Sequence, residues 1–175
     1  MGVAMDQLVI SCLAPEEIEP LIALAHRIWH AHYPAIITVE QIDYMLSRGY
    51  TPEVIRHEMA QEGIIWLTIK ASGEMIGFAS VGPYGEGIMK LHKLYLLPER
   101  HGQGIGARAL EEVNRIARET HAHRLVLNVN KHNTVAIKAY RRAGWQVIEE
   151  VVADIGNGFV MDDFVMSKQV SRKDT

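Results

Sequence analysis

A turn with three glycines constrains the fold of this chain more than any other stretch: ERHGQGIGARAL, residues 99–110. The run before it, LHKLYLLP, is apolar enough for a strand, and the run after it, ARALEEVNRIARET, carries apolar residues at helical spacing. Glycine lets a backbone approach a ligand closely, and the start of a helix offers free N–H groups at the positive end of its dipole. The order strand, glycine turn, helix therefore predicts a site for an anionic group such as a phosphate.

Apolar periodicity and turn residues divide the rest of the chain into helices and strands. The expected helices are residues 15–33, 38–49, 51–63, 104–119 and 133–144, with Thr38, Thr51 and Asn133 capping three of them. The inward stripe of the helix after the glycine turn would be Ile105, Ala109, Leu110, Val113, Ile116 and Ala117. The expected strands are residues 6–14, 64–71, 74–83, 88–98, 123–130, 145–155 and 158–168. This order is typical of an α/β fold, so we expect a central mixed, mostly antiparallel sheet flanked by helices.

Composition bounds the organisation of the chain and its partners. With 175 residues, 48% of them hydrophobic, the chain is long enough for one compact domain with a full core, which we place over residues 1–175. The formal net charge of −3 gives no basic field for nucleic acid, and no run approaches the ~18 consecutive apolar residues of a membrane span. We therefore expect neither nucleic acid nor a membrane as a partner. The single cysteine, Cys12, lies in an apolar run and is expected to be buried, which fits a reducing cytoplasm.

Two other phosphate-binding motifs compete for the glycine turn. A Walker P-loop needs a Lys followed by Ser or Thr, and counting five residues on from Gly102 reaches Ala107 with no such pair behind it. The letters GIGARA match the permissive GxGxxA form of a dinucleotide site. That site needs a carboxylate ~20 residues further on, at the end of the next strand. Here the next strand ends in NVNK, residues 128–131, with no acid, which disfavours a dinucleotide.

The glycine turn and the segment after it together resemble the GCN5-related N-acetyltransferase (GNAT) superfamily. The superfamily's loop for the pyrophosphate of coenzyme A reads Q/R-x-x-G-x-G/A, and its second signature is an Asn, a Tyr seven residues later and then a Gly with an aromatic residue. Here these residues are Asn133, Tyr140, Gly144 and Trp145. The two blocks span about residues 88–150. The resemblance implies the GNAT fold, acetyl-CoA as cofactor and transfer of the acetyl group directly from the thioester to a primary amine.

By this resemblance, the loop holds coenzyme A mainly through backbone N–H groups. His101 stands where the superfamily usually has Gln or Arg, which implies less help from that side chain rather than lost binding. The splayed strand before the loop pairs with the pantetheine arm, and the N–H of Leu96 faces the thioester oxygen. The cofactor-binding residues implied are Leu94, Tyr95, Leu96, His101, Gly102, Gln103, Gly104, Ile105, Gly106, Ala107, Asn133 and Tyr140. Nearby positive charges, for the phosphates or merely for the surface, are Arg100, Arg108, Lys131 and Lys138.

Acetyl transfer to an amine needs a neutral nitrogen, a group that stabilises the oxyanion and a proton for the departing thiolate. Tyr140 matches the tyrosine that the superfamily places beside the sulfur, and a phenol of pKa near ~10 can protonate a thiolate whose acid lies near ~8.5. Some members carry a glutamate base on the strand before the loop, where this chain has His92 as the residue that titrates near neutrality. His92 is therefore a candidate base, on one face with Leu94 and Leu96 by alternation. A structural histidine and a water relay are the alternatives.

The resemblance also places the first helix and the last strands around the acceptor. Trp29, Tyr33 and Tyr44 would shape that pocket, although core packing is the alternative role for all three. Asp162 and Asp163 lie among apolar residues, and alternation puts them on opposite faces, so one of them needs a partner or a ligand. A polyamine or another small cationic amine would supply it, and a peptide amine is another acceptor. Pairing with Lys or Arg, or exposure to solvent, is the alternative for both carboxylates.

Metal binding, activity and assembly complete the predictions. His26 and His30 lie four residues apart, but Arg27 replaces the Glu of an HExxH motif and no third ligand is evident, so we expect no metal. A domain that keeps the coenzyme A loop but only senses acyl-CoA is the rival to an enzyme, and the presence of Tyr140 argues against it. Because members of the superfamily often dimerise, a homodimer is one expectation for the assembly.

Overall fold

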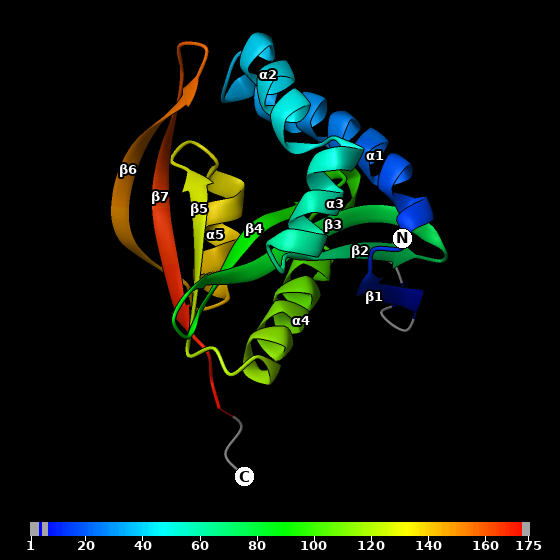
Figure 1. Ribbon diagram of the computed structural model, residues 1–175, viewed down its shortest axis with the longest axis vertical. Helices are drawn as coiled ribbons and strands as arrows, with labels where there is room; N and C mark the ends of the chain where they lie inside the picture. The colour runs from blue at the N-terminus through cyan, green and yellow to red at the C-terminus, as the bar shows by residue number, and fades with distance from the viewer. Residues whose placement is uncertain (1–3, 5–6, 173–175) are drawn as a thin grey trace.

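The computed structural model describes residue 4 and residues 7–172 of the chain. Its strands form one seven-stranded sheet in the order β1-β2-β3-β4-β5-β7-β6 (Figure 1). The strands are β1 (Leu8–Cys12), β2 (Ile65–Ala71), β3 (Glu74–Gly85), β4 (Ile88–Leu96), β5 (Arg124–Asn130), β6 (Gln146–Gly156) and β7 (Phe159–Gln169). The helices are α1 (Ile18–His32), α2 (Val39–Gly49), α3 (Pro52–Gln61), α4 (Ile105–Glu119) and α5 (Thr134–Arg142), with short 3-10 helices at Pro15–Glu17, Tyr33–Ala35 and Pro98–Arg100. The expected start of the first strand, at Asp6, lies outside the described residues.

The sheet is mixed and mostly antiparallel, as the sequence predicts. Among the described strands, β4 and β5 form the one parallel pair, and the other neighbouring pairs are antiparallel. A parallel pair needs a crossover, which here runs through the glycine turn and α4. The β2–β3 hairpin turns at Ser72 and Gly73, whose φ values of 51° and 81° suit a tight hairpin turn. The expected α/β fold is confirmed.

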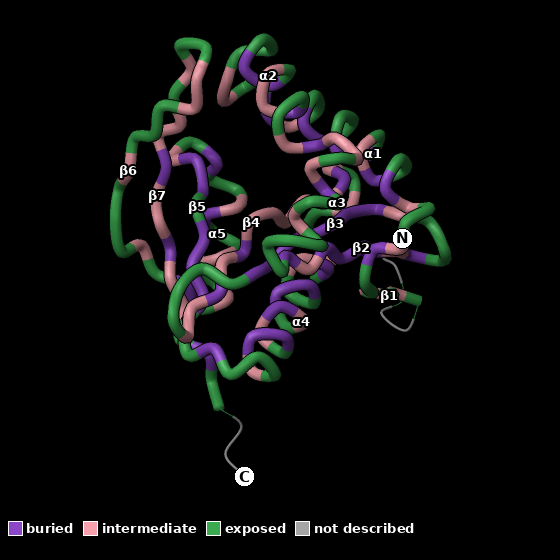
Figure 2. The backbone as a smooth tube through the Cα atoms, viewed as in Figure 1, coloured by how far each residue is buried: buried purple, intermediate pink, exposed green. Residues whose placement is uncertain are grey.

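Helices cover both faces of the sheet, and each face has its own apolar core (Figures 1 and 2). One cluster of buried side chains joins α1, α2 and α3 to residues such as Trp66 and Phe78 of the sheet. The other joins α4 and α5 to Leu91 and Leu127. The helices therefore hold the sheet from both sides, and the strands near its centre are the most buried.

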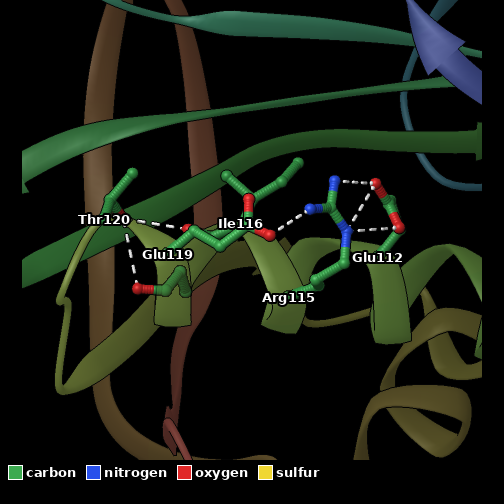
Figure 3. Close-up of polar contacts among 6 residues, drawn as sticks. Glu112, Arg115, Ile116, Glu119 and Thr120 are labelled. Atoms are coloured by element: carbon green, nitrogen blue, oxygen red, sulfur yellow. Dashed lines mark hydrogen bonds and ion pairs between the residues drawn. The ribbon is translucent and has the colours of Figure 1, made fainter.

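Local sequence signals fix α4 in detail. The six residues of its predicted stripe are buried: Ile105, Ala109, Leu110, Val113, Ile116 and Ala117. On the exposed face, Arg115 pairs with Glu112 at 2.6 Å and with Glu119, and Thr120 Oγ1 donates to carbonyl oxygens of the last turn (Figure 3). Exposed pairs of this kind contribute little to stability, so the buried stripe decides how α4 lies on the sheet.

The parallel strands β4 and β5 pair over only part of their lengths. Ile88–Leu91 pairs with Arg124–Leu127, after which β4 continues beside β3 and β5 continues beside β7. Figure 1 shows the two ribbons diverging beyond that point. Two strands that diverge leave backbone N–H and C=O groups without a strand partner, and these groups need another partner.

A bulge interrupts β4 at the start of its diverging half. The register with β3 steps from Ser80 opposite Lys93 to Val81 opposite Leu91, which leaves His92 without a partner residue on β3. An extra residue in one strand breaks the alternation of side chains. The bulge lies on the Leu91 side of His92, so the prediction that His92 shares a face with Leu94 and Leu96 by alternation stays a prediction.

The prediction that Cys12 is buried is also wrong. Cys12 is exposed at the end of β1, and Figure 2 shows β1 as a partly exposed strand at one edge of the sheet. An edge strand has a neighbour on one side only, so an apolar run in such a strand does not ensure burial.

Candidate active site

A cavity of about 610 Å³ opens where β4 and β5 diverge. Its walls come from the second half of β4, the glycine turn, the first turn of α4, the end of β5 and α5, together with the end of α1 and one stretch of β7. These elements are far apart in the sequence, and the sheet order brings them to one place. The cavity therefore collects most of the side chains that the sequence singled out.

The glycine turn forms one wall of this cavity. Gly102 and Gly104 have φ values of 74° and 79°, a left-handed conformation that other residues rarely adopt. No side chain caps the start of α4, where Gly104 is the N-cap residue. A methyl group added at either glycine would meet no described protein atom within 4 Å. The turn thus presents free N–H groups to open space, as an anion site requires.

His101 fastens this turn to the end of β4. Its Nε2 donates to the carbonyl oxygen of Leu96 at 3.2 Å, and its ring lies edge-on to that of His32 with 6.4 Å between centroids. Leu97 N donates to Ile76 O at 2.9 Å, so the N–H of Leu96, one residue earlier, points to the opposite edge of the strand, toward the cavity. The edge of β4 that faces the cavity is therefore open to a ligand.

Eleven of the twelve predicted cofactor-binding residues line the cavity: Leu94, Tyr95, Leu96, His101, Gly102, Gly104, Ile105, Gly106, Ala107, Asn133 and Tyr140. Gln103 does not line it, and its amide donates to Glu99 O at 3.3 Å. Position within the loop identified Gln103, but alternate residues of a tight turn point in different directions. The turn as a whole therefore lies at the cavity, whereas Gln103 lies apart from it, and the binding of the cofactor by these residues stays a prediction.

The positive charges near the cavity differ from those expected. Arg100 and Lys138 line the cavity, and so does Arg142, which the sequence reading did not single out. Arg142 follows Lys138 by four residues on α5, and helical spacing is the signal that would have found it. Arg108 instead pairs with Glu111 at 3.3 Å. Lys131, paired elsewhere, also does not line the cavity.

Tyr140 lies in the wall of the cavity on α5. Burial raises the pKa of its phenol, and the nearby Tyr33 raises that pKa further. Its ring also contacts Trp145, with 5.8 Å between centroids. Tyr140 therefore keeps its proton at neutral pH and can donate it to a group inside the cavity.

Asn133 joins α5 to the end of α1. Its Oδ1 accepts hydrogen bonds from Ala136 N at 3.4 Å and from His32 Nε2 at 3.1 Å. The first bond confirms the cap predicted for this helix, and the second brings His32 into the cavity wall, a residue that no sequence motif indicated. The side chain of Asn133 thus caps α5 and also lines the cavity.

His92 also lines the cavity, in an unfavourable setting for positive charge. Burial, followed by the charges of Lys90 and Lys93, lowers the pKa of its imidazole to about 4. Lys93 itself lies over aromatic rings, with its Nζ 5.3 Å from the centre of Tyr50 and 5.1 Å from that of Trp66. His92 is therefore neutral at physiological pH.

The two adjacent aspartates of β7 have different surroundings. Asp162 pairs with Lys131 at 2.7 Å, and the same lysine pairs with Glu150 at 3.1 Å. Asp163 is 8% exposed and lines the cavity, and its Oδ1 has no hydrogen-bond partner among the described residues. The opposite environments agree with the alternation of side chains along a strand.

Of the three aromatic residues expected around the acceptor, two line the cavity. Trp29 and Tyr33 are buried in its wall, and the hydroxyl of Tyr33 lies 3.2 Å from that of Tyr95. Tyr44 lies outside the lining. Its hydroxyl donates instead to Ile155 O at 2.8 Å.

This contact belongs to a clasp between α2 and the β6–β7 hairpin, near the top of Figure 1. Gln41 Nε2 completes the clasp by donating to Val160 O at 2.9 Å. Gly156, in the same hairpin, has a φ of 94°, and a methyl group added there would collide with the hydroxyl of Tyr44. The clasp thus joins two segments more than a hundred residues apart in the sequence.

The helical histidines make protein contacts of their own. His30 Nε2 lies 2.8 Å from Asp43 Oδ1, and His30 Nδ1 lies 2.8 Å from His26 O. Across the described residues, no group of three His, Cys, Asp or Glu side chains lies close enough together to hold a metal ion.

No described helix is long and apolar enough to cross a bilayer.

Known proteins share this architecture. The model of the acetyltransferase (GNAT) family matches residues 24–145. The spermidine N(1)-acetyltransferase of Thermoplasma acidophilum is 27% identical over 154 residues, which cover 86% of this chain and 92% of the relative. The peptidyl-lysine N-acetyltransferase YjaB of Salmonella typhimurium is 29% identical over 147 residues, covering 82% and 88%. The crystal structure of the PaiA N-acetyltransferase from T. acidophilum, in complex with coenzyme A, matches 93% of this chain and 98% of that chain with a TM-score of 0.79 and 26% identity.

The family match covers more than half of the chain, so the chain belongs to the acetyltransferase (GNAT) family. The chain is an N-acetyltransferase with the GNAT fold. The resemblance drawn from the glycine turn and the Asn133–Tyr140 spacing is thereby confirmed.

Proposed function

We propose that the chain binds acetyl-CoA in the cavity and transfers its acetyl group directly to a primary amine of a small molecule. The observation that carries the proposal is the uncapped start of α4, where Gly102 and Gly104 hold a left-handed conformation in the cavity wall. Free N–H groups at a helix start suit a pyrophosphate. The coenzyme A complex of the similar T. acidophilum protein supports the same ligand here.

Other groups of the chain suit the remaining parts of this ligand. Arg100, Lys138 and Arg142 line the cavity near the turn and favour phosphate charge. The unpaired edge of β4 offers hydrogen bonds to the amides of the pantetheine arm, and the N–H of Leu96 points toward the cavity to meet the thioester oxygen. When bound, acetyl-CoA supplies the acetyl group as an activated thioester.

Tyr140 is proposed to deliver a proton in this reaction, and the sequence indicates His92 as a candidate to remove one. Tyr140 donates the proton that the departing thiolate requires, and its burial keeps that proton in place at neutral pH. His92 is the base expected from the sequence, and it is neutral at pH 7 and so free to accept a proton. A pKa of about 4 makes its imidazole a weak acceptor, however, so it takes a proton from an ammonium ion only against a large difference in pKa.

The acceptor we propose is a polyamine or another small cationic amine. Support comes from the buried carboxylate of Asp163 in the cavity wall and from the relative named as a spermidine N(1)-acetyltransferase. Trp29 and Tyr33 would shape the pocket for the chain of the amine. Asp162 is less suited to this role than the sequence suggests, because Lys131 already pairs with it. A peptide amine is the second candidate, supported by the peptidyl-lysine relative.

The test is release of free coenzyme A from acetyl-CoA with a panel of amines. The panel contains spermidine, spermine, aminoglycosides, free amino acids and peptide N-termini. Turnover with the polyamines and little with the others is the expected result. Acetyl-CoA binding without turnover of any amine would instead support the rival, a domain that only senses acyl-CoA.

Three further proposals rest on the sequence and the superfamily. We propose a single domain over residues 1–175, a homodimer as its assembly and the cytoplasm as its location. Light scattering of the purified protein measures the first two together, because a compact dimer has a defined mass and radius.

A further inference from the structure

Asp163 is a buried carboxylate that the described residues satisfy only in part, because a hydrogen bond from the Asn128 side chain reaches the carboxylate. The residue is 8% exposed, and its Oδ1 has no hydrogen-bond partner among the described residues. Burying a charged group without a partner is unfavourable, so such a group in a cavity wall points to a ligand. The side chain also lies on the wall of the cavity in which acetyl transfer is proposed to occur.

The cations nearest to Asp163 are engaged elsewhere. Lys131 pairs with Asp162 and with Glu150, and Lys90 Nζ lies 4.8 Å from the centre of the Tyr84 ring. In the part of the chain that the structure describes, neither lysine forms an ion pair with Asp163. The carboxylate of Asp163 can therefore form an ion pair with a cationic ligand that enters the cavity.

His92, which also lines the cavity, offers an ammonium ion a poorer environment. Lys90 and Lys93 flank it in the sequence, and both of their charges disfavour a further positive charge on its imidazole. The same two charges repel an approaching ammonium ion. An ammonium ion is therefore better received by the carboxylate of Asp163 than by the imidazole of His92.

We infer that Asp163 receives the acceptor amine as an ammonium ion and accepts one of its protons, so that the amine attacks in its neutral form. This inference rests on the proposed function. The nitrogen lone pair then forms the bond to the acetyl carbon, and the carbon–sulfur bond breaks with its electron pair on sulfur. Tyr140 protonates the sulfur and regains a proton from the product nitrogen, while Asp163 releases its proton to solvent. One proton is therefore released for each ammonium ion acetylated.

The charges around Asp163 give the pH dependence its sign. Burial raises the pKa of the Asp163 carboxyl, a hydrogen bond from the Asn128 side chain on β5 lowers it, Asp162 raises it, and the charges of Lys90 on β4 and Lys131 lower it. Tyr33, from the α1 side, also senses the charge of Asp163. An ammonium ion binds the ionised carboxylate, so amine affinity is full above this raised pKa and is lost as pH falls through it.

The first experiment measures binding without turnover. Calorimetry of spermidine binding, in the absence of acetyl-CoA, compares wild type with Asp163→Asn over a pH series. We expect at least ~10-fold weaker binding by Asp163→Asn, with no loss of affinity toward acid pH. Glu150→Gln is the matched control, because Glu150 is a carboxylate on the neighbouring strand that contacts Lys131 outside the cavity. Equal spermidine affinity in wild type and Asp163→Asn would overturn the inference.

The second experiment separates proton transfer from simple attraction. At saturating spermidine and neutral pH, kcat of Asp163→Asn should fall ~100-fold, the size of effect typical of a lost general base. That kcat should recover as pH rises, because solution then supplies the neutral amine. Asp163→Glu, which keeps the carboxylate, should retain part of kcat. A rise in KM with kcat unchanged would mean that Asp163 only attracts the amine, and the inference would be wrong.

Measurements of melting temperature and of acetyl-CoA affinity distinguish failure of this inference from failure of the proposed function. Replacing a buried carboxylate that is only partly hydrogen-bonded by an amide should leave the melting temperature of Asp163→Asn unchanged or raise it. Acetyl-CoA affinity of this variant should equal that of wild type. If wild type binds acetyl-CoA but neither binds nor acetylates spermidine, the inference and the polyamine assignment both fail. If wild type does not bind acetyl-CoA at all, the proposed function itself fails.

Discussion

The two halves of β4 differ in what lies beside them. Ile88–Leu91 has a strand on each side, β3 and β5, and its Met89 and Leu91 are buried. His92–Leu96 has a strand only on the β3 side, and all five of its residues line the cavity. One continuous strand is thus paired on both sides in its first half and lines the cavity along its second half. The bulge at His92 marks the change, so substitutions on either side of it should affect different measurements.

The largest effect we expect is a loss of stability from Met89→Ala in the paired half. Met89 is 5% exposed, and Thr120 Oγ1 lies 2.9 Å from its sulfur. Truncation leaves a cavity in the core, so the free energy of unfolding should fall by about 3 kcal/mol, inside the ~2–5 kcal/mol found for such changes. Urea denaturation measures the loss, and the folded variant should bind acetyl-CoA as wild type does. A fall in affinity with full stability would contradict the division of β4.

The next effect concerns turnover in the cavity that the second half of β4 lines together with α5. Tyr140→Phe removes only a hydroxyl from the cavity wall, so kcat should fall ~100-fold or more, equivalent to ~2.7 kcal/mol, while acetyl-CoA affinity changes little. Steady-state release of coenzyme A with spermidine measures it. Tyr84→Phe is the control, because Tyr84 is 58% exposed and lies outside the cavity. Equal turnover of Tyr140→Phe and wild type would reduce Tyr140 to a packing residue.

A smaller effect should follow from a methyl group at the start of α4. Gly106 is helical, and a Cβ there would lie 3.8 Å from Leu96 Cδ1, an ordinary contact, so Gly106→Ala should fold normally. The methyl group takes space from the ligand, and acetyl-CoA affinity should fall ~10-fold, or ~1.4 kcal/mol. Gly49→Ala, at the end of α2 with nothing within 4 Å of the added carbon, is the control.

This variant is cleaner than Gly104→Val, which also strains a residue with a φ of 79°. Calorimetry of acetyl-CoA binding checks both variants. Unchanged affinity in folded Gly106→Ala and Gly104→Val proteins would argue against the coenzyme A site.

The smallest effect we expect concerns the contact between His30 on α1 and Asp43 on α2. A hydrogen bond to His26 O, and then Asp43, raise the pKa of His30. A raised pKa means that the contribution to stability is complete below the ordinary histidine pKa and is lost as pH rises through the raised value. The melting temperature of wild type should therefore decline slightly as pH rises, and this decline should be smaller in His30→Gln. Added salt should reduce the difference between the two proteins, because both side chains of the pair are exposed. An identical pH profile in wild type and variant would remove any role for the pair.

Sequence alone predicted the elements whose signals are local. The stripe of α4, the caps Thr38, Thr51 and Asn133, and the hairpin at Ser72 and Gly73 depend on residues a few positions apart. The glycine turn belongs to the same class, because its conformation follows from Gly102 and Gly104 themselves. For such features, spacing contains the physical cause of the structure.

Features that depend on distant partners were predicted less well. The bulge at His92 arises from the register with β3, and the exposure of Cys12 arises from the edge position of β1. Whether Asp162 or Asp163 is free was decided by Lys131, which lies on another element. Spacing along one segment cannot report such partners, so the acceptor side of the site was less predictable than the turn at α4.

The clasp between α2 and the β6–β7 hairpin has a consequence for the mobility of that hairpin. Any side chain at Gly156 must displace the hydroxyl of Tyr44 from Ile155 O, because the two would occupy the same space. A change at this one position would therefore loosen a contact between segments that are distant in sequence. Neither Gly156 nor Tyr44 lines the cavity, so such a change would alter the mobility of the hairpin and leave the residues of the cavity wall unchanged.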